Sequence, residues 1–285
     1  MKKRVRKVKS DYTREMLPHN RKEVFWDVLK LQWKSLLFMG VILFVFSLPL
    51  LVSAIVEDVY ITSVYDSLPQ NATIEQQQVA AYSVLTFSSV KSFVEILFYI
   101  VFAIGLAGVS RIIRQFCWGE NVFFASDFSL GLKQNVKQYV WIALIGGFLF
   151  AISIVCANFS SIISDSILSI ILYFPILLFI LVVLPIVGLI LTMIPIYSGS
   201  LLKRLRIAFV VFAQKPLVFI AALICCLLPY FVCVIPNTYC HILGRIVGAI
   251  ILPFVLLGWN LFCYNRLDEV VNKKYYPDIV GKGTY

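Results

Sequence analysis

Long apolar runs dominate this sequence and limit what it can fold into. A helix of about 20 residues crosses a hydrocarbon layer of ~30 Å, and six runs approach or exceed this length. They extend from Leu36 to Val56, Phe93 to Ser110, Val140 to Asn158, Ile167 to Tyr197, Leu217 to Ile235 and Ile246 to Cys263. The chain is 60% hydrophobic and 14% charged, which is unlike a soluble globular domain. The sequence therefore predicts an all-α, polytopic membrane protein with six transmembrane helices.

The distribution of basic residues predicts how these helices are oriented. The chain has 25 Lys and Arg and a formal net charge of +10. If the N-terminus is cytoplasmic, all of these residues except Lys91 and Arg245 fall in cytoplasmic segments. Such a bias is typical of the inner side of the cell membrane, so we expect a multi-pass protein with both termini cytoplasmic. The charge is explained by topology and by attraction to anionic lipid headgroups, so we expect no nucleic-acid partner.

The predicted spans divide the chain into three parts. Residues 1–35 form a basic cytoplasmic arm and an interfacial helix, residues 36–265 form the membrane domain, and residues 266–285 form a cytoplasmic tail. Residues 57–90 are the only sizeable external segment of the membrane domain, and we expect them to form a loop.

The polar passage between the second and third spans predicts an amphipathic helix at the membrane surface. Ser126 and Asp127 can cap it. The apolar positions are Phe128, Leu132, Val136 and Tyr139, and the lysines on another side are Lys133 and Lys137. We expect this helix to lie in the inner interface, with its lysines among lipid headgroups.

A similar pattern precedes the first span, at an offset of 103 residues (from 25 to 128). Its apolar positions are Phe25, Leu29, Trp33 and Leu36, and its lysines are Lys30 and Lys34. A fainter third copy, with Leu205, Phe209 and Ala213, precedes the fifth span. This internal repeat predicts three hairpins, each introduced by an interfacial helix.

The motifs of common enzymes are absent from the sequence. It has no P-loop, no HExxH and no GxSxG pattern, and its two histidines leave no zinc-type spacing. We therefore expect no enzyme, no metal and no cofactor. No ionisable residue lies near the centre of a span, and the candidates nearest to one, Glu95 and Arg245, lie near the outer edge, which argues against proton coupling. Glu95 is one helical turn from Lys91, and we expect the two to pair.

The fourth apolar run is too long for a simple span. From Ile167 to Tyr197 it would measure ~46 Å as one helix, and it contains Pro175, Pro185 and Pro195. Discontinuous helices of this kind mark substrate sites in transporters. The alternative is a tilted, kinked helix whose inner end emerges into the cytosol.

The passage from Arg111 to Gln138 resembles the central motif of the YesL-like family of bacterial membrane proteins. The matching residues are Arg111, Gly119-Glu120, Phe123-Phe124, Asp127-Phe128 and Lys133 to Gln138. The opening from Phe25 to Pro49 resembles the family's first hairpin, but the family has a short Thr-Ile-Gly link where this chain has residues 57–90. The resemblance implies a bacterial protein with six spans and an association with carbohydrate uptake systems, but no known reaction.

These observations favour a non-enzymatic accessory or regulatory protein that works beside a carbohydrate transport system. Its candidate binding face toward a partner or lipid is Arg111, Arg114, Asp127, Lys133 and Lys137. The alternative is a secondary transporter of a small solute that uses the proline-broken fourth helix.

Overall fold

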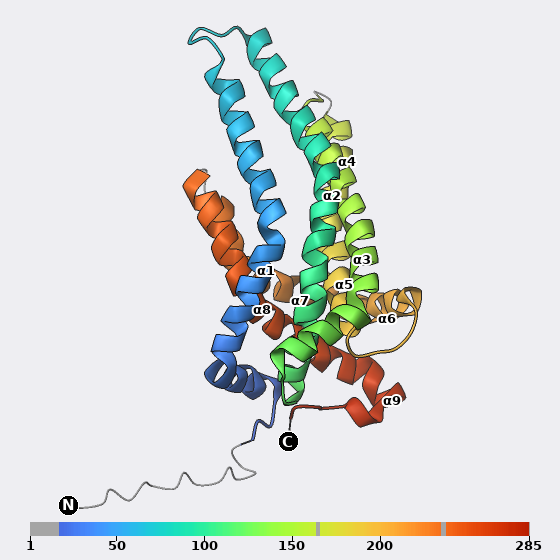
Figure 1. Ribbon diagram of the computed structural model, residues 1–285. Coiled ribbons are helices and arrows are strands. Elements are labelled where there is room, and N and C mark those ends of the chain that lie inside the picture. The colour runs from blue at the N-terminus through green and yellow to red at the C-terminus, as the bar shows by residue number, and fades with distance from the viewer. Residues whose placement is uncertain (1–16, 164–165, 235–237, 285) are drawn as a thin grey trace, which may run out of the picture.

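The computed structural model describes residues 17–163, 166–234 and 238–284, which are almost entirely helical and include no strand (Figure 1). Five helices in this part of the chain are long and apolar enough to cross a membrane. They are α1 (Arg21–Asp66), α2 (Ile74–Trp118), α3 (Phe124–Ser160), the continuous helix Ser166–Met193 and the helix Ile242–Tyr275. A sixth span is reached only if the bent pair of α6 (Leu201–Gln214) and α7 (Pro216–Leu227) counts as one. By length and composition, the chain is an all-helical membrane protein.

The remaining elements are shorter helical segments that lie within these spans or in the C-terminal part of the chain. They are α4 (Ser166–Leu178), η2 (Phe179–Val183), α5 (Leu184–Met193), η3 (Leu228–Val234), α8 (Thr238–Leu267), η4 (Asp268–Asn272), α9 (Lys273–Tyr275) and η5 (Pro277–Ile279).

Helices α1 and α2 extend well beyond the thickness of a membrane. They contain 46 and 45 residues, or about 68 Å at 1.5 Å per residue. Their far ends form a helical hairpin that projects past the other helices (Figure 1). The prediction of a loop over 57–90 is therefore wrong, because only residues 67–73 leave the helices. Thr73 and Gln76 form a capping box that starts α2, and the rings of Tyr60 and Phe87 stack at 4.2 Å between the two helices.

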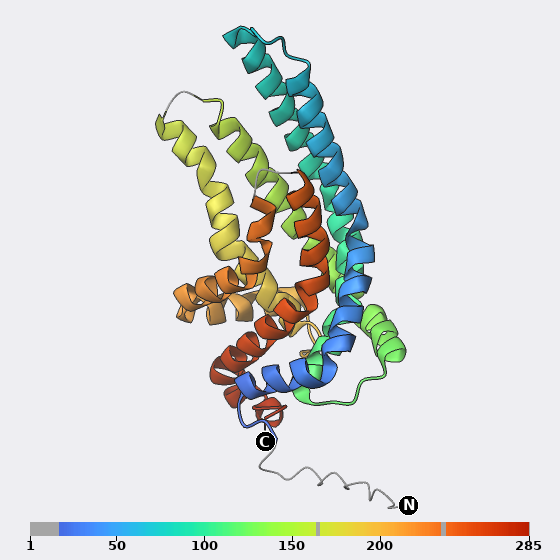
Figure 2. The ribbon, with the colours of Figure 1, turned by 90° about the vertical axis from the view of Figure 1, so that its left-hand side faces the viewer.

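The two predicted interfacial helices are the first turns of α1 and α3 rather than separate elements. Figure 2 shows the beginning of α1 crossing below the bundle before the helix rises. Part of each apolar stripe is covered by protein, since Leu36 and Tyr139 are fully buried. Phe128 packs so closely on α2 that a Cβ on Gly108 would lie 2.4 Å from its ring. Contact between these turns and lipid acyl chains stays a prediction.

Helix α6 contains the third of the predicted amphipathic segments. Ser200 caps it by accepting a hydrogen bond from the Lys203 backbone N–H, and the chain turns by 98° between α6 and α7. Pro216 stands at the first position of α7, where a missing N–H costs no helical hydrogen bond. Leu202 and Phe209 are exposed on this helix.

The packing of the helices does not divide the molecule into three hairpins. Helix α2 packs most extensively against α3, across the boundary of two predicted hairpins, and α8 packs back against α1 (Figure 2). The closest approach of α1 and α8 is at Gly40, where a Cβ would lie 2.2 Å from the carbonyl oxygen of Ile250. The three-hairpin grouping therefore stays a prediction.

The fourth apolar run forms one continuous helix with a π-helical turn, not a broken one. The turn is η2, between α4 and α5. Pro175 lies inside α4 and Pro185 follows the π-turn, where the widened turn accommodates a residue without an N–H. Pro195 lies beyond the end of the helix. Of the two alternatives, the helix is thus the continuous one, and its tilt and the emergence of its inner end into the cytosol stay predictions.

The C-terminal residues pack on the end of the bundle where α1 begins (Figure 1). Asp268 in η4 accepts hydrogen bonds from the Arg21 guanidinium at 2.8 Å, the Asn272 side-chain amide at 2.7 Å and the Gly281 backbone N–H at 3.2 Å. These contacts tie the beginning of α1 to the end of the chain.

Candidate functional site

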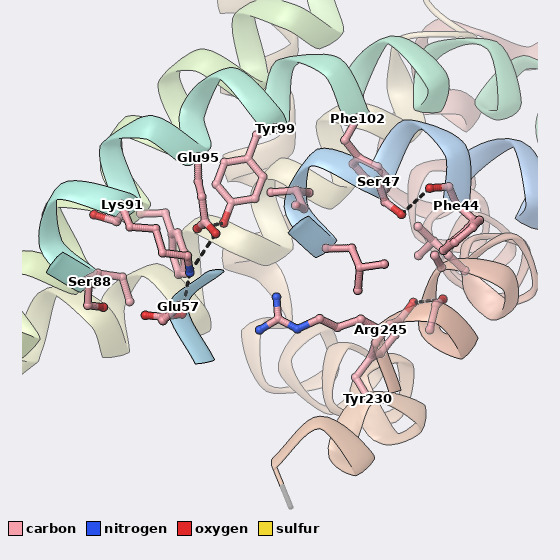
Figure 3. A pocket seen from close by; sticks show the side chains of 18 residues that line it. Phe44, Ser47, Glu57, Ser88, Lys91, Glu95, Tyr99, Phe102, Tyr230 and Arg245 are labelled. Carbon is pink, nitrogen blue, oxygen red and sulfur yellow. Dashed lines mark hydrogen bonds and ion pairs between the residues drawn. The ribbon is translucent and has the colours of Figure 1, made fainter. Parts of the chain in front are cut away.

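A cavity of about 480 Å³ lies between α1, α2, α3, η3 and α8 (Figure 3). Sites for small solutes usually measure ~300–1,000 Å³ and have mostly apolar walls with a few polar groups. The walls here include the aromatic side chains of Tyr99, Phe102, Phe150 and Tyr230. Four ionisable residues also line the cavity: Glu57, Lys91, Glu95 and Arg245.

Lys91 joins the two carboxylates of the cavity. Its Nζ lies 2.6 Å from Oε2 of Glu57 on α1 and 3.0 Å from Oε1 of Glu95, one turn along α2. The predicted pairing of Lys91 with Glu95 is therefore confirmed, and Glu57 is an additional partner. The three side chains fasten α1 to α2 where the projecting hairpin meets the bundle.

Glu95 is the most deeply held of these groups. Its residue is 8% exposed, and its carboxylate accepts hydrogen bonds from Ser53 Oγ at 2.8 Å and Tyr99 OH at 3.4 Å. We expected Glu95 to lie near the outer edge within reach of water, but it is enclosed between helices. A charge in such a place needs partners, and here Lys91 and two hydroxyl groups supply them.

Arg245 on α8 differs from the other three charged residues. It forms no hydrogen bond or ion pair with any residue in the described part of the chain. Figure 3 shows its guanidinium group directed across the cavity toward Lys91 and Glu57. Among the described residues, the cavity therefore has an ion-paired cluster on α1 and α2, and a cation on α8 that pairs with none of them.

A second cavity of about 390 Å³ adjoins the first and is lined by α2, α3, η2 and α5. Tyr99, Phe102 and Phe150 line both cavities and form the wall that they share. The lining of the second cavity is almost wholly apolar and includes Phe179 of the π-turn. The fourth apolar run thus lines this cavity with a residue of its π-helical turn, and the helix is not interrupted there.

The comparisons with known proteins give no relative. No family model, no curated protein and no solved structure matches this chain. The function is therefore argued from the geometry, and the YesL-like resemblance depends on its motif residues alone.

Two of the predicted site residues, Arg111 and Asp127, lie together where α2 ends and α3 begins. Arg111 Nε lies 3.7 Å from the carboxylate of Asp127, and Arg111 also donates to Gln134 at 2.6 Å. Asp127 is buried and accepts a hydrogen bond from the Phe123 backbone N–H at 2.8 Å. The N-cap residue of α3 is Phe123, so the predicted cap at Ser126 and Asp127 is wrong, because both residues lie inside the helix. These contacts join α2 to α3 and leave little of Arg111 and Asp127 for a partner.

The other three cationic candidates differ in their surroundings. Arg114 pairs with Glu120 at 2.8 Å and stacks over the ring of Trp118. Lys133 and Lys137 are exposed and pair with nothing in the described part of the chain. The two lysines are thus the candidates that remain available to lipid headgroups, and their binding of anionic lipid stays a prediction.

Sequence reasoning missed the cavity because its charged residues come from three helices far apart in the chain. One signal did point to it. Lys91 and Arg245 are the two basic residues that do not follow the predicted inner bias, and both line the cavity.

Proposed function

We propose that this integral membrane protein binds a small polar solute in the charged cavity and catalyses no reaction there. The observation that carries the proposal is the free Arg245 facing an ion-paired cluster across a cavity of solute size. Ionisable groups among membrane helices are costly and usually serve a function. Charged residues that only held helices together would be ion-paired and packed, whereas Arg245 lines a cavity and pairs with no residue in the described part of the chain.

The role of such binding is that of an accessory or regulatory component beside an uptake system. The YesL-like resemblance supports an association with carbohydrate uptake, and the exposed Lys133 and Lys137 offer a basic inner surface for a partner or anionic lipid. The cavity supports solute binding but does not by itself indicate a sugar. The two parts of the proposal are therefore tested separately.

A second candidate function is a carrier that moves the solute itself. The adjoining apolar cavity favours it, because Tyr99, Phe102 and Phe150 separate an outer polar space from one that reaches toward Tyr139 and Leu191. A carrier would give saturable uptake by the protein alone in liposomes. An accessory protein would give none, and transporter subunits would co-purify with it from native membranes in mild detergent.

Solute binding is tested by thermal melting of the purified protein with maltose, glucuronate and alanyl-alanine. A solute that binds only the folded state stabilises it by about 2.7 kcal/mol at a concentration of 100 Kd. We expect at least one of these solutes to raise the melting temperature in a saturable manner. We expect Ser88→Trp, which fills the cavity wall, to abolish that rise, and Ser129→Trp on the exposed side of α3 to preserve it.

Two outcomes would contradict solute binding in this cavity. One is the absence of any saturable rise with all three solutes. The other is an equal rise in wild type and Ser88→Trp, which would place the bound solute elsewhere on the protein.

A further inference from the structure

The charges in the cavity are unevenly distributed between its two sides. The side formed by α1 and α2 has two carboxylates, Glu57 and Glu95, and one ammonium group, Lys91, so its formal charge is −1. The side formed by α8 has Arg245 and a formal charge of +1 (Figure 3). A solute that matches both sides carries one charge of each sign.

The two carboxylates also differ in how many further hydrogen bonds they can accept. Glu95 is occupied by Lys91, Ser53 and Tyr99. Glu57 forms an ion pair with Lys91 and no other hydrogen bond or ion pair in the described part of the chain. A carboxylate can accept about four hydrogen bonds, so Glu57 is the acceptor with room for a donor from the solute. None of the five N–H donors of Arg245 has a hydrogen-bond partner among the residues that the structure describes.

We propose that the cavity binds a small zwitterion, such as an amino acid or short peptide, with its ammonium group on Glu57 and its carboxylate on Arg245. This inference depends on the proposed function, since it names the solute class for the same cavity. A planar guanidinium group binds a carboxylate through two parallel hydrogen bonds, and the rings of Tyr99 and Phe102 give an apolar side chain a surface to pack on. A neutral sugar would leave Arg245 without a carboxylate partner, and a simple anion would give Glu57 no donor beyond Lys91.

Calorimetry of the purified protein with alanyl-alanine, N-acetyl-alanyl-alanine and alanyl-alanine amide tests this inference. The acetyl group removes the ammonium charge and the amide removes the carboxylate charge. We expect the dipeptide to bind and each derivative to bind about tenfold more weakly or worse, because a hydrogen bond to a charged group is lost each time. Maltose should not bind.

The variants assign each end of the dipeptide to its residue. In Arg245→Gln we expect the dipeptide and its amide to bind with equal affinity. In Glu57→Gln we expect the dipeptide and its acetyl derivative to bind with equal affinity. Arg245→Lys keeps the positive charge, so it should still bind the dipeptide more tightly than the amide. This variant tests the role of Arg245 if Arg245→Gln does not fold. Arg206→Gln, at an exposed arginine of α6, should bind like wild type.

Each remaining outcome decides between the two proposals. If maltose binds and alanyl-alanine does not, or if both derivatives bind as well as the dipeptide, solute binding stands and the zwitterion is excluded. If neither the dipeptide nor maltose binds in calorimetry, and neither they nor glucuronate raise the melting temperature, both proposals are wrong.

Discussion

We expect Gly40→Ala to lower the melting temperature and folding yield of this protein sharply, whereas Gly146→Ala leaves both close to wild type. At Gly40 an added Cβ would lie 2.2 Å from the Ile250 carbonyl oxygen and 2.8 Å from its Cα. These are backbone atoms of α8, so no side chain can turn aside and the two helices must separate. At Gly146 nothing lies within 4 Å of the added atom.

Overpacking of a helix crossing costs ~1–3 kcal/mol or more, and this crossing also positions one wall of the cavity. Thermal melting in detergent measures the effect, and the comparison of two Gly→Ala changes in membrane helices cancels differences in helix propensity. Equal melting temperatures for the two variants would mean that α1 and α8 do not meet at Gly40.

The second large effect is expected for Lys91→Met. This change preserves the length of the side chain but leaves Glu57 and the enclosed Glu95 without their shared cation. Removing one member of a buried ion pair costs ~3–5 kcal/mol, mainly because the remaining charge is uncompensated. Lys203→Met, at an exposed lysine of α6, is the matched control and should change stability little.

A double variant separates loss of charge pairing from loss of packing. In Lys91→Met with Glu95→Gln the enclosed charge is also removed, so we expect much of the lost stability to return. The melting temperatures of wild type, both single variants and the double variant form a cycle that gives the coupling energy. A double variant that is as unstable as the sum of its parts would show that Lys91 acts through packing alone.

The apolar runs were sufficient to predict the helical class and the number of long spans to within one. They did not predict the projecting hairpin, because residues 57–66 and 74–90 are too polar to look like a span and have no fixed apolar period. One local signal was present. Thr73 and Gln76 have the spacing of a capping box, and that motif predicts a helix start where we expected a loop.

The candidate site was harder to predict than the fold. Arg111 and Asp127 looked like a basic and acidic face for a partner, yet they face one another across α2 and α3. Their pairing depends on how closely α3 crosses α2, at Gly108, which the chain order does not show. Glu57, Lys91 and Arg245 line one cavity for the same kind of reason. Polarity at single positions is visible in a sequence, whereas the partner of each polar group is decided by helix packing.

The proposal that the cavity holds a solute, together with the predicted topology that makes it open to the outside, is tested most directly by labelling Ser88→Cys. The label is an impermeant maleimide, applied to intact cells in a background without native cysteines. Ser88 lines the cavity, and Lys133→Cys serves as the control for the inner side. We expect Ser88→Cys to be labelled from outside, and its labelling to slow when one of maltose, glucuronate or alanyl-alanine is added in turn, while Lys133→Cys is labelled only after permeabilisation. Labelling of Ser88→Cys only in permeabilised cells, or at a rate that none of the three solutes changes, would contradict the account.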